Sequence, residues 1–480
     1  MKDNAPAEKA FRTALGAVCI FAGVHTVMCL LTACFLPGGP PWTFVFLGLE
    51  AAAAAAAFVL CAAALIWAVR RRLPALGGFA GVFRSLRDPS FYLAAAWCIW
   101  SFIACALAIR RGLGGLYNNV RYLFYLAASL LVLFPLGCYM GRENKRAPLH
   151  LLYDVCLGFF CVFILYGFYR FLRGDMSFTA IFDRVYRFNR ARVRFGQNAN
   201  ATGAYCVFFL VMGVYRMTAL KKNLHKALLA LALLPLLTAC ALTSSRSAIL
   251  SGGLACGFLA GETVYRRREK KGLSSLLPAA GAFVLATGLI LGCFYGLRAL
   301  LLILKKQLVL FYAATGAKKA ADSRDILDTL TDLNGRGVIW RSVILCLKKD
   351  PRLLLYGCTQ SSTVKTVEEL MGKSVNTHNQ LLEVLLAYGL PALALFVAWL
   401  ICTAGKSLAL GLDTTAEDGR WMLPATLLFL VANNMTETML VARGHFTGCF
   451  FFLIAGYVCG MAKKKPKQAR EESLSPHSPE

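Results

Sequence analysis

Two arginines and a histidine are the residues whose chemistry could act on a phosphate-bearing substrate. Arg336 lies in LNGRGVIW, Arg246 in LTSSRSAIL and His378 in NTHNQLLE. A planar guanidinium can donate two parallel hydrogen bonds to a phosphate, and a neutral imidazole can take up a proton near neutral pH. Each residue also has a structural explanation, because arginines near a membrane surface reach lipid headgroups and an isolated histidine is more often structural.

The two arginines are expected at helix N-termini. Ser244 and Ser245 could cap a helix that begins at Arg246, and a helix N-terminus beside a guanidinium makes a good phosphate site. Asn334 is expected to cap a second helix, with Gly335 at a close approach and Arg336 in the first turn. That helix should run to about Lys349, because Asp350-Pro351 ends it.

His378 and Asn379 are expected where the chain re-enters the membrane, and three polar residues should face them from within spans. Glu383 follows five residues after His378. Asn433 and Glu437 fall within the eleventh predicted span. Amides and acids inside a membrane usually face the protein interior, so these residues are candidates for a buried polar site.

The composition is that of a polytopic helical membrane protein. The chain has 480 residues, of which 58% are hydrophobic, and a mean hydropathy of +0.58. Its apolar stretches are each long enough to span the hydrocarbon layer, whereas a β-barrel would show short alternating strands. The first stretch is expected to be a span and not a cleavable signal. Twelve spans are predicted, with approximate limits 13–36, 43–69, 91–109, 122–140, 151–171, 203–219, 227–243, 247–264, 275–296, 382–403, 421–440 and 446–461.

The net charge of +27 reflects membrane topology and not binding to nucleic acid. The Lys and Arg residues lie mostly in short loops, as the positive-inside rule requires. The rule places both termini in the cytoplasm, together with the basic segments 70–72, 142–146, 221–226, 266–271 and 463–467. Five regions follow: spans one to five with an Arg-rich outer loop (1–202), spans six to nine (203–296), a large extracytoplasmic loop containing helices (297–381), spans ten to twelve (382–461) and a disordered cytoplasmic tail (462–480).

The outer segment between residues 170 and 202 is rich in arginine and includes Arg192 and Arg194. Arginine in excess on the translocated side could contact lipid headgroups. It could also form an electropositive vestibule for an anionic substrate. The use of arginine without lysine favours phosphate as the anion.

The cysteines and the missing motifs predict no metal site and no cofactor. The 18 Cys residues fall mostly in apolar runs, where they should act as small hydrophobic residues. No CxxC or Cys/His cluster with metal-ligand spacing appears, and neither a DxD, an HExxH nor a nucleotide-binding glycine motif is present. Cys346 and Cys358 in the large loop could form a disulfide.

The motifs resemble those of the O-antigen ligase and polymerase superfamily (Wzy_C type). The resemblance covers roughly residues 190–440 and lies in the order, topology and spacing of the motifs. They are QNAN (197–200), the SSR that ends at Arg246, GR…W with Arg336 and Trp340, DP…YG (350–357), HNQLLE (378–383) and YGLPALAL (388–395).

This resemblance implies a metal-independent, GT-C-like glycosyltransferase in the bacterial cytoplasmic membrane. Its donor would be a glycan on undecaprenyl diphosphate, and its acceptor a hydroxyl of a lipid or glycan on the outer side. The family's functional positions fall on Arg246, Arg336 and His378. Direct attack by the acceptor would invert the anomeric centre. Expected substrate contacts are Arg192, Arg194, Asn198, Asn200, Trp340, Asn379, Glu383 and Glu437.

Three alternatives stay open at this stage. The motifs do not separate a ligase from a polymerase of the same superfamily, and they give neither the acceptor nor the oligomeric state. A transporter or flippase for a lipid-linked saccharide would also use twelve spans and an arginine-lined cavity. Internal repeats would support a transporter, but residues 1–200 and 203–461 show no similarity to each other. A structural membrane partner would have no need of His378.

Overall fold

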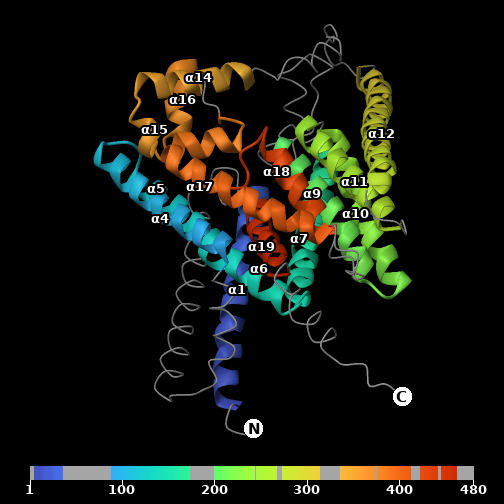
Figure 1. Cartoon of the computed structure of the whole chain (residues 1–480). Helices are drawn as coiled ribbons and strands as arrows, with labels where there is room; N and C mark the ends of the chain where they lie inside the picture. Colours follow the sequence, from blue (N-terminus) through green and yellow to red (C-terminus); the bar gives the residue numbers. More distant parts are fainter. Residues whose placement is uncertain are drawn as a thin grey trace, which may run out of the picture.

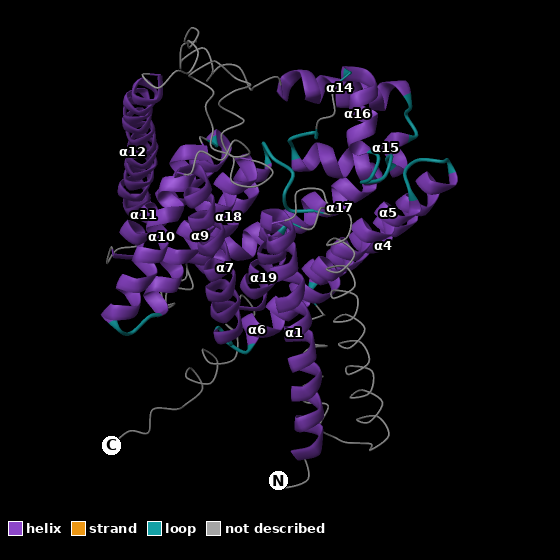
Figure 2. Cartoon of the chain, turned by 180° about the vertical axis from the view of Figure 1, so that it is seen from behind, coloured by secondary structure: helices purple, strands orange, loops and turns teal. Residues whose placement is uncertain are grey.

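The computed structural model describes residues 5–35, 88–172, 199–243, 245–267, 273–313, 336–372, 376–411, 422–441 and 445–461. These residues form helices and turns, with no strand among them, so the predicted all-helical class is confirmed (Figures 1 and 2). The helices are α1 (Ala5–Phe35), α4 (Pro89–Arg110), α5 (Leu116–Ala127), the π-helical η2 (Ala128–Leu133), α6 (Phe134–Arg142), α7 (Ala147–Leu172), α9 (Ala199–Ala219), α10 (Asn223–Thr243), α11 (Arg246–Arg267), α12 (Leu273–Ala313), α14 (Arg336–Lys349), α15 (Leu353–Tyr356), α16 (Thr363–Met371), α17 (Gln380–Gly411), α18 (Leu423–Asn434) and α19 (Phe446–Met461).

The helices support a multi-pass membrane protein. Within the described ranges, nine continuous helical stretches are long and apolar enough to span a membrane, and α18 and α19 are shorter apolar helices. Each of these eleven coincides with a predicted span. The remaining predicted span, 43–69, lies outside the described residues, so the count of twelve stays a prediction.

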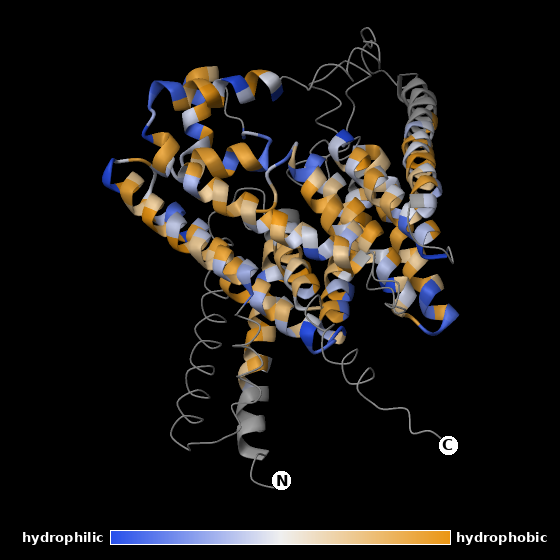
Figure 3. Cartoon of the chain, in the orientation of Figure 1, coloured by the Kyte–Doolittle hydropathy of each residue, from blue (hydrophilic) through white to orange (hydrophobic). Residues whose placement is uncertain are grey.

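Polar turns gather at the two ends of the helix bundle (Figure 3). One end carries the basic turns 142–146 and 220–222, and the other carries the α4–α5 turn with α14, α15 and α16 (Figure 1). The positive-inside rule assigns the first end to the cytoplasm. The bundle thus has the separation of ends that the topology prediction requires, while the orientation of the termini stays a prediction.

Small residues allow the central helices to pack at short distance. Gly137 on α6 lies against the backbone of α19, and Gly456 on α19 lies against the backbone of α6, so a Cβ at either position would clash. Gly141 and Gly460 repeat this arrangement one turn further along. Paired small residues of this kind are how helices associate closely in lipid. The α6–α19 pair is therefore a fixed centre for the bundle.

Helix α12 is longer than the predicted ninth span. It has 41 residues and continues to Ala313, whereas the span was expected to end at 296. At 1.5 Å per residue it is about 60 Å long, which exceeds the hydrocarbon thickness. It packs along α11, where Gly257 contacts Phe283 and Thr287. The part of the chain predicted as the start of the large loop is thus helical.

A break in α17 lies where the membrane bundle meets the outer helices α14, α15 and α16. Pro391 has no N–H, so the Ala387 carbonyl loses its helical donor, and Gly389 adopts the non-helical angles φ 82° and ψ 179°. The freed Leu386 and Ala387 carbonyls accept hydrogen bonds of 2.8 and 3.0 Å from the backbone N–H groups of Cys358 and Thr359. Irregular backbone at membrane depth requires such partners. The break therefore holds the segment after α15 against α17.

Candidate functional site

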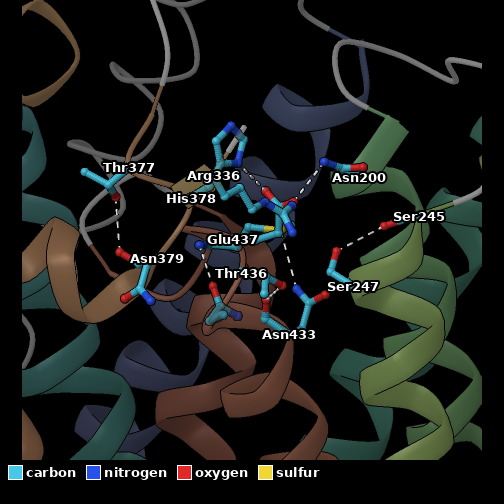
Figure 4. Close-up of polar contacts among 12 residues, drawn as sticks. Asn200, Ser245, Ser247, Arg336, Thr377, His378, Asn379, Asn433, Thr436 and Glu437 are labelled. Carbon is cyan, nitrogen blue, oxygen red and sulfur yellow. Dashed lines mark hydrogen bonds and ion pairs between the residues drawn. The ribbon is translucent and has the colours of Figure 1, made fainter. Parts of the chain in front are cut away.

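The carboxylate of Glu437 joins three residues from distant parts of the chain (Figure 4). Its Oε1 atom accepts hydrogen bonds of 2.6 Å from Arg336 Nη2 and 2.8 Å from Asn200 Nδ2. Its Oε2 atom lies 3.2 Å from His378 Nδ1. The Glu437 side chain is only 4% exposed, whereas His378 is 23% exposed. The structure thus brings together one predicted arginine, the predicted histidine and two predicted substrate contacts.

Glu437 lies in a turn and not, as predicted, within the eleventh span. Helix α18 ends at Asn434, whose Oδ1 accepts a 2.6 Å hydrogen bond from the Met439 N–H. The Leu440 N–H donates to Gln380 Oε1 at 3.1 Å, which ties the turn to the start of α17. Asn433 is buried under the same turn. Side-chain capping of this kind competes with helix propagation, and it fixes the position of the carboxylate.

Arg336 is the first described residue of α14, and the helix ends at Lys349, before Asp350, as the sequence predicted. Its guanidinium is 13% exposed and pairs with Glu437. Ile339 and Val343 are buried on the inner face of α14 and belong to the outer apolar cluster. This packing fixes the helix, so the arginine has a defined direction. Asn334 and Gly335, the predicted cap and close approach, lie outside the described residues.

His378 has a backbone conformation that few residues other than glycine adopt. Its φ is +49°, and a non-glycine residue with positive φ signals a constrained position. The constraint comes from both neighbours. The Thr377 carbonyl accepts a 3.1 Å hydrogen bond from Trp340 Nε1, and Asn379 Oδ1 caps α17 through the Leu381 and Leu382 N–H groups. The imidazole is therefore held toward Glu437.

Three of the expected substrate contacts bind protein groups. Glu383 is fully buried and accepts hydrogen bonds from Gln360, Thr363 and Thr377. Trp340 holds Thr377, and Asn379 caps α17 and donates to the Met435 carbonyl at 3.1 Å. These contacts give all three residues a positioning role around His378.

Arg246 begins α11, at the N-terminus where the sequence predicted it. Ser245 precedes the helix, and its hydroxyl lies 3.4 Å from the Ser247 hydroxyl. A Cβ at Gly203 would lie 2.5 Å from Ser245 Cβ, so the starts of α9 and α11 are in contact. Asn200, in the first turn of α9, bonds Glu437. The N-terminus of α11 thus adjoins the site, and Figure 4 shows Ser245 and Ser247 there.

The outer helices are tied to α4 by a charged contact that the sequence did not reveal. Arg111 donates to Asp350 Oδ2 at 2.8 Å and to Tyr356 Oη at 2.7 Å. The Arg111 guanidinium beside it holds the pKa of the Asp350 carboxyl below its ordinary value. This contact explains two positions of the DP…YG motif by packing. Nothing in the sequence linked them to Arg111, which lies more than two hundred residues earlier.

Some predicted residues lie outside the described ranges, and one predicted disulfide is not formed. Arg192, Arg194 and Asn198 lie outside the described residues. Cys346 and Cys358 are both buried and free, so no disulfide joins them. Cys346 lies instead 3.6 Å from the Thr366 carbonyl. Among the described residues, side chains that could hold a metal converge away from Glu437, at His25, Cys29 and Cys449.

The fold and the site define a multi-pass helical membrane protein with a buried Arg–Glu–His arrangement at one end of its bundle. Residues 227–397 match the model of the O-antigen ligase family (Wzy_C), which confirms the predicted resemblance over that stretch. The matched stretch contains Arg246, Arg336 and His378, whereas Asn200 and Glu437 lie outside it. No curated protein shows significant similarity to the chain.

Proposed function

We propose that this protein is a glycosyltransferase of the bacterial cytoplasmic membrane. It would transfer a glycan from undecaprenyl diphosphate to a hydroxyl of a lipid or glycan acceptor on the outer side. The family match supports an O-antigen ligase or polymerase type of enzyme. The observation that carries the mechanism is the position of Glu437 between Arg336 and His378.

His378 is the general base in this proposal. A carboxylate that accepts Nδ1–H fixes the imidazole tautomer and leaves the Nε2 lone pair free to take a proton. Glu437 is placed to do this at 3.2 Å. The other two carboxylates considered from sequence are poor bases, because Glu383 is fully buried with three donors and Glu437 already accepts from Arg336 and Asn200. The base would remove the acceptor proton as the oxygen attacks the anomeric carbon.

Arg336 and Arg246 bind the diphosphate in this proposal. As the glycosidic bond breaks, negative charge grows on the leaving diphosphate, and fixed cationic donors stabilise it without a metal ion. Glu437 holds one edge of the Arg336 guanidinium, and the remaining N–H groups can face a substrate. Arg246 begins a helix whose N-terminal dipole also favours an anion. Direct attack by the acceptor would invert the anomeric configuration.

The test is transfer by the purified protein in detergent or liposomes, with a glycan on a polyprenyl diphosphate as donor. We expect a glycosylated acceptor from wild type and at least a hundredfold slower reaction from Arg336→Ala. Arg341→Ala is the matched control, because Arg341 is an exposed arginine on the same helix. Offering a lipid acceptor and a second lipid-linked glycan in parallel separates a ligase from a polymerase. Movement of intact donor across liposomes without transfer would instead support a transporter.

A further inference from the structure

Three metal-ligand side chains meet inside the helix bundle, behind the site. They are His25, Cys29 and Cys449, and one ligand atom from each lies within 4.8 Å of the other two. All three are buried, with exposed fractions of 1%, 2% and 3%. Cys449 lies more than 400 positions after His25 and Cys29 in the chain, so the local spacing of cysteines in the sequence did not indicate the cluster.

Two helices place these ligands. His25 and Cys29 are four residues apart on α1 and therefore share one face of that helix. Cys449 lies in the first turn of α19, directly after the turn that carries Glu437. The Thr447 hydroxyl donates to the Met439 carbonyl at 3.3 Å, so the start of α19 and the Glu437 turn are connected.

The surroundings of the cluster are aromatic and apolar. The His25 ring stacks on Phe21 with centroids 5.7 Å apart and meets Phe124 edge-on at 6.0 Å. Tyr125 lies 5.6 Å away on another side. Such walls exclude water and fix the ring, as the shell of a metal site does. Thr26, which follows His25 on α1, is fully buried, and its hydroxyl donates to the Ala22 carbonyl at 2.8 Å.

We propose that His25, Cys29 and Cys449 bind one zinc ion. Thiolate and imidazole are the ligands that zinc prefers, while magnesium and calcium prefer oxygen. On binding, the two thiols lose their protons to solvent, and two thiolates with Zn²⁺ and a neutral imidazole form an uncharged complex. A single copper(I) ion on the same ligands would leave a net negative charge, which is costly inside a membrane protein.

The zinc ion would join α1 to the start of α19, next to the turn that carries Glu437. It would have no part in the transfer reaction. Without an ion, the same three residues would be a buried histidine beside two cysteines that pack as small hydrophobic residues. The two explanations differ in metal content. A structural site adds its binding free energy to folding, so loss of zinc should also lower the thermal stability of the protein.

The test is the metal content of the full chain, purified with a tag that contains no histidines and measured by mass spectrometry of the elements. We expect about one zinc per chain for wild type, as for a single structural site. Cys29→Ser and Cys449→Ser should reduce zinc to the level of the buffer. Cys98→Ser, a buried cysteine on α4 outside the cluster, should keep the full content.

A second measurement covers the case in which the serine variants do not fold. Wild type loaded with cobalt(II) should show thiolate-to-cobalt charge-transfer absorption, because both sulfurs would bind the ion. Wild type without zinc and without this absorption overturns the proposal. So do zinc retained by Cys449→Ser, copper found in place of zinc, or a Cys29–Cys449 disulfide detected by mass spectrometry.

Discussion

His378 Nδ1 lies 3.2 Å from Glu437 Oε2, and this contact joins a strained residue before α17 to a turn after α18. The same carboxylate binds Arg336 at 2.6 Å through its other oxygen. One acid thus sets the direction of both the proposed base and the proposed phosphate-binding cation. A change in Glu437 should therefore affect both roles at once.

We predict that His378→Ala slows transfer by roughly a hundredfold to ten-thousandfold, the usual contribution of a general base. Binding of the lipid-diphosphate donor should persist, because the imidazole removes a proton and does not bind the anion. Glu437→Gln should slow transfer at least as much. The double variant should be little slower than Glu437→Gln alone, since residues acting as one unit are not additive.

The measurements are single-turnover transfer rates and donor binding on the same membrane preparations. Glu368→Gln, an exposed acid on α16, serves as the control for the charge change and should transfer normally. Full transfer by His378→Ala would show that this histidine is not the base.

Arg336→Ala should raise the activation free energy of transfer by about 3–4 kcal/mol, because a fixed donor to the growing anion is lost. The transfer rate should then fall by roughly a hundredfold or more. Arg336→Lys should recover only part of the rate, since an ammonium gives one point contact where a guanidinium gives two. Steady-state kinetics of the two variants beside Arg341→Ala provide the comparison. Equal rates for Arg336→Ala and Arg341→Ala would remove Arg336 from the mechanism.

Transfer should survive brief treatment with EDTA, because arginines are proposed to neutralise the diphosphate. The initial rate is measured before and after chelation, with the zinc content of the same sample as a control for the buried cluster. A rate lost to EDTA and restored by magnesium or manganese would contradict a metal-independent mechanism at this site.

Local sequence patterns predicted the helices and some of their ends. Apolar length predicted the membrane helices, and the end of α14 at Lys349 followed from the helix stop signal at Asp350-Pro351. The sequence also placed His378 and Glu437 among the candidates. It could not show that one carboxylate bridges Arg336 and His378, because that depends on how α14, α17 and α18 pack.

Sequence patterns could not predict features that depend on tertiary contacts. Glu437 was expected inside a helix, but Asn434 caps the end of α18 and leaves a turn there. No motif joins Cys29 and Cys449 in the sequence, and only the packing of α1 on α19 brings them together with His25. Pairs so distant in the chain leave no periodic signal in a single sequence.

The Arg111–Asp350 contact should make stability depend on pH in a defined direction. The pKa of Asp350 is lowered by Arg111, so its contribution is present above the unfolded value of about 3.9 and is lost as the pH falls through the folded pKa. We expect Arg111→Gln to lower the melting temperature at pH 7. The difference from wild type should shrink below about pH 4.

Thermal unfolding followed by tryptophan fluorescence from pH 8 to pH 3 checks this prediction. Arg110→Gln removes an exposed neighbouring charge and should leave the curve unchanged. A difference between Arg111→Gln and wild type that grows as the pH falls would contradict the sign of the effect.

Gly389 should tolerate no side chain, because the break in α17 depends on its backbone. Its φ of 82° and ψ of 179° lie in a region that is essentially restricted to glycine, which alone costs another residue about 1–3 kcal/mol. A Cβ there would also clash with the Leu355 carbonyl. Gly389→Ala should therefore lower the melting temperature and reduce transfer, since α17 begins at the segment that holds His378.

Gly405 is the matched control on the same helix. It has open space around it and helical geometry, so Gly405→Ala should keep activity and gain up to about 1 kcal/mol from helix propensity. The two variants are compared by thermal unfolding and by transfer rate after purification at equal yield. Opposite shifts in melting temperature are the expected result. If Gly389→Ala instead melts like wild type, the break in α17 does not depend on the glycine.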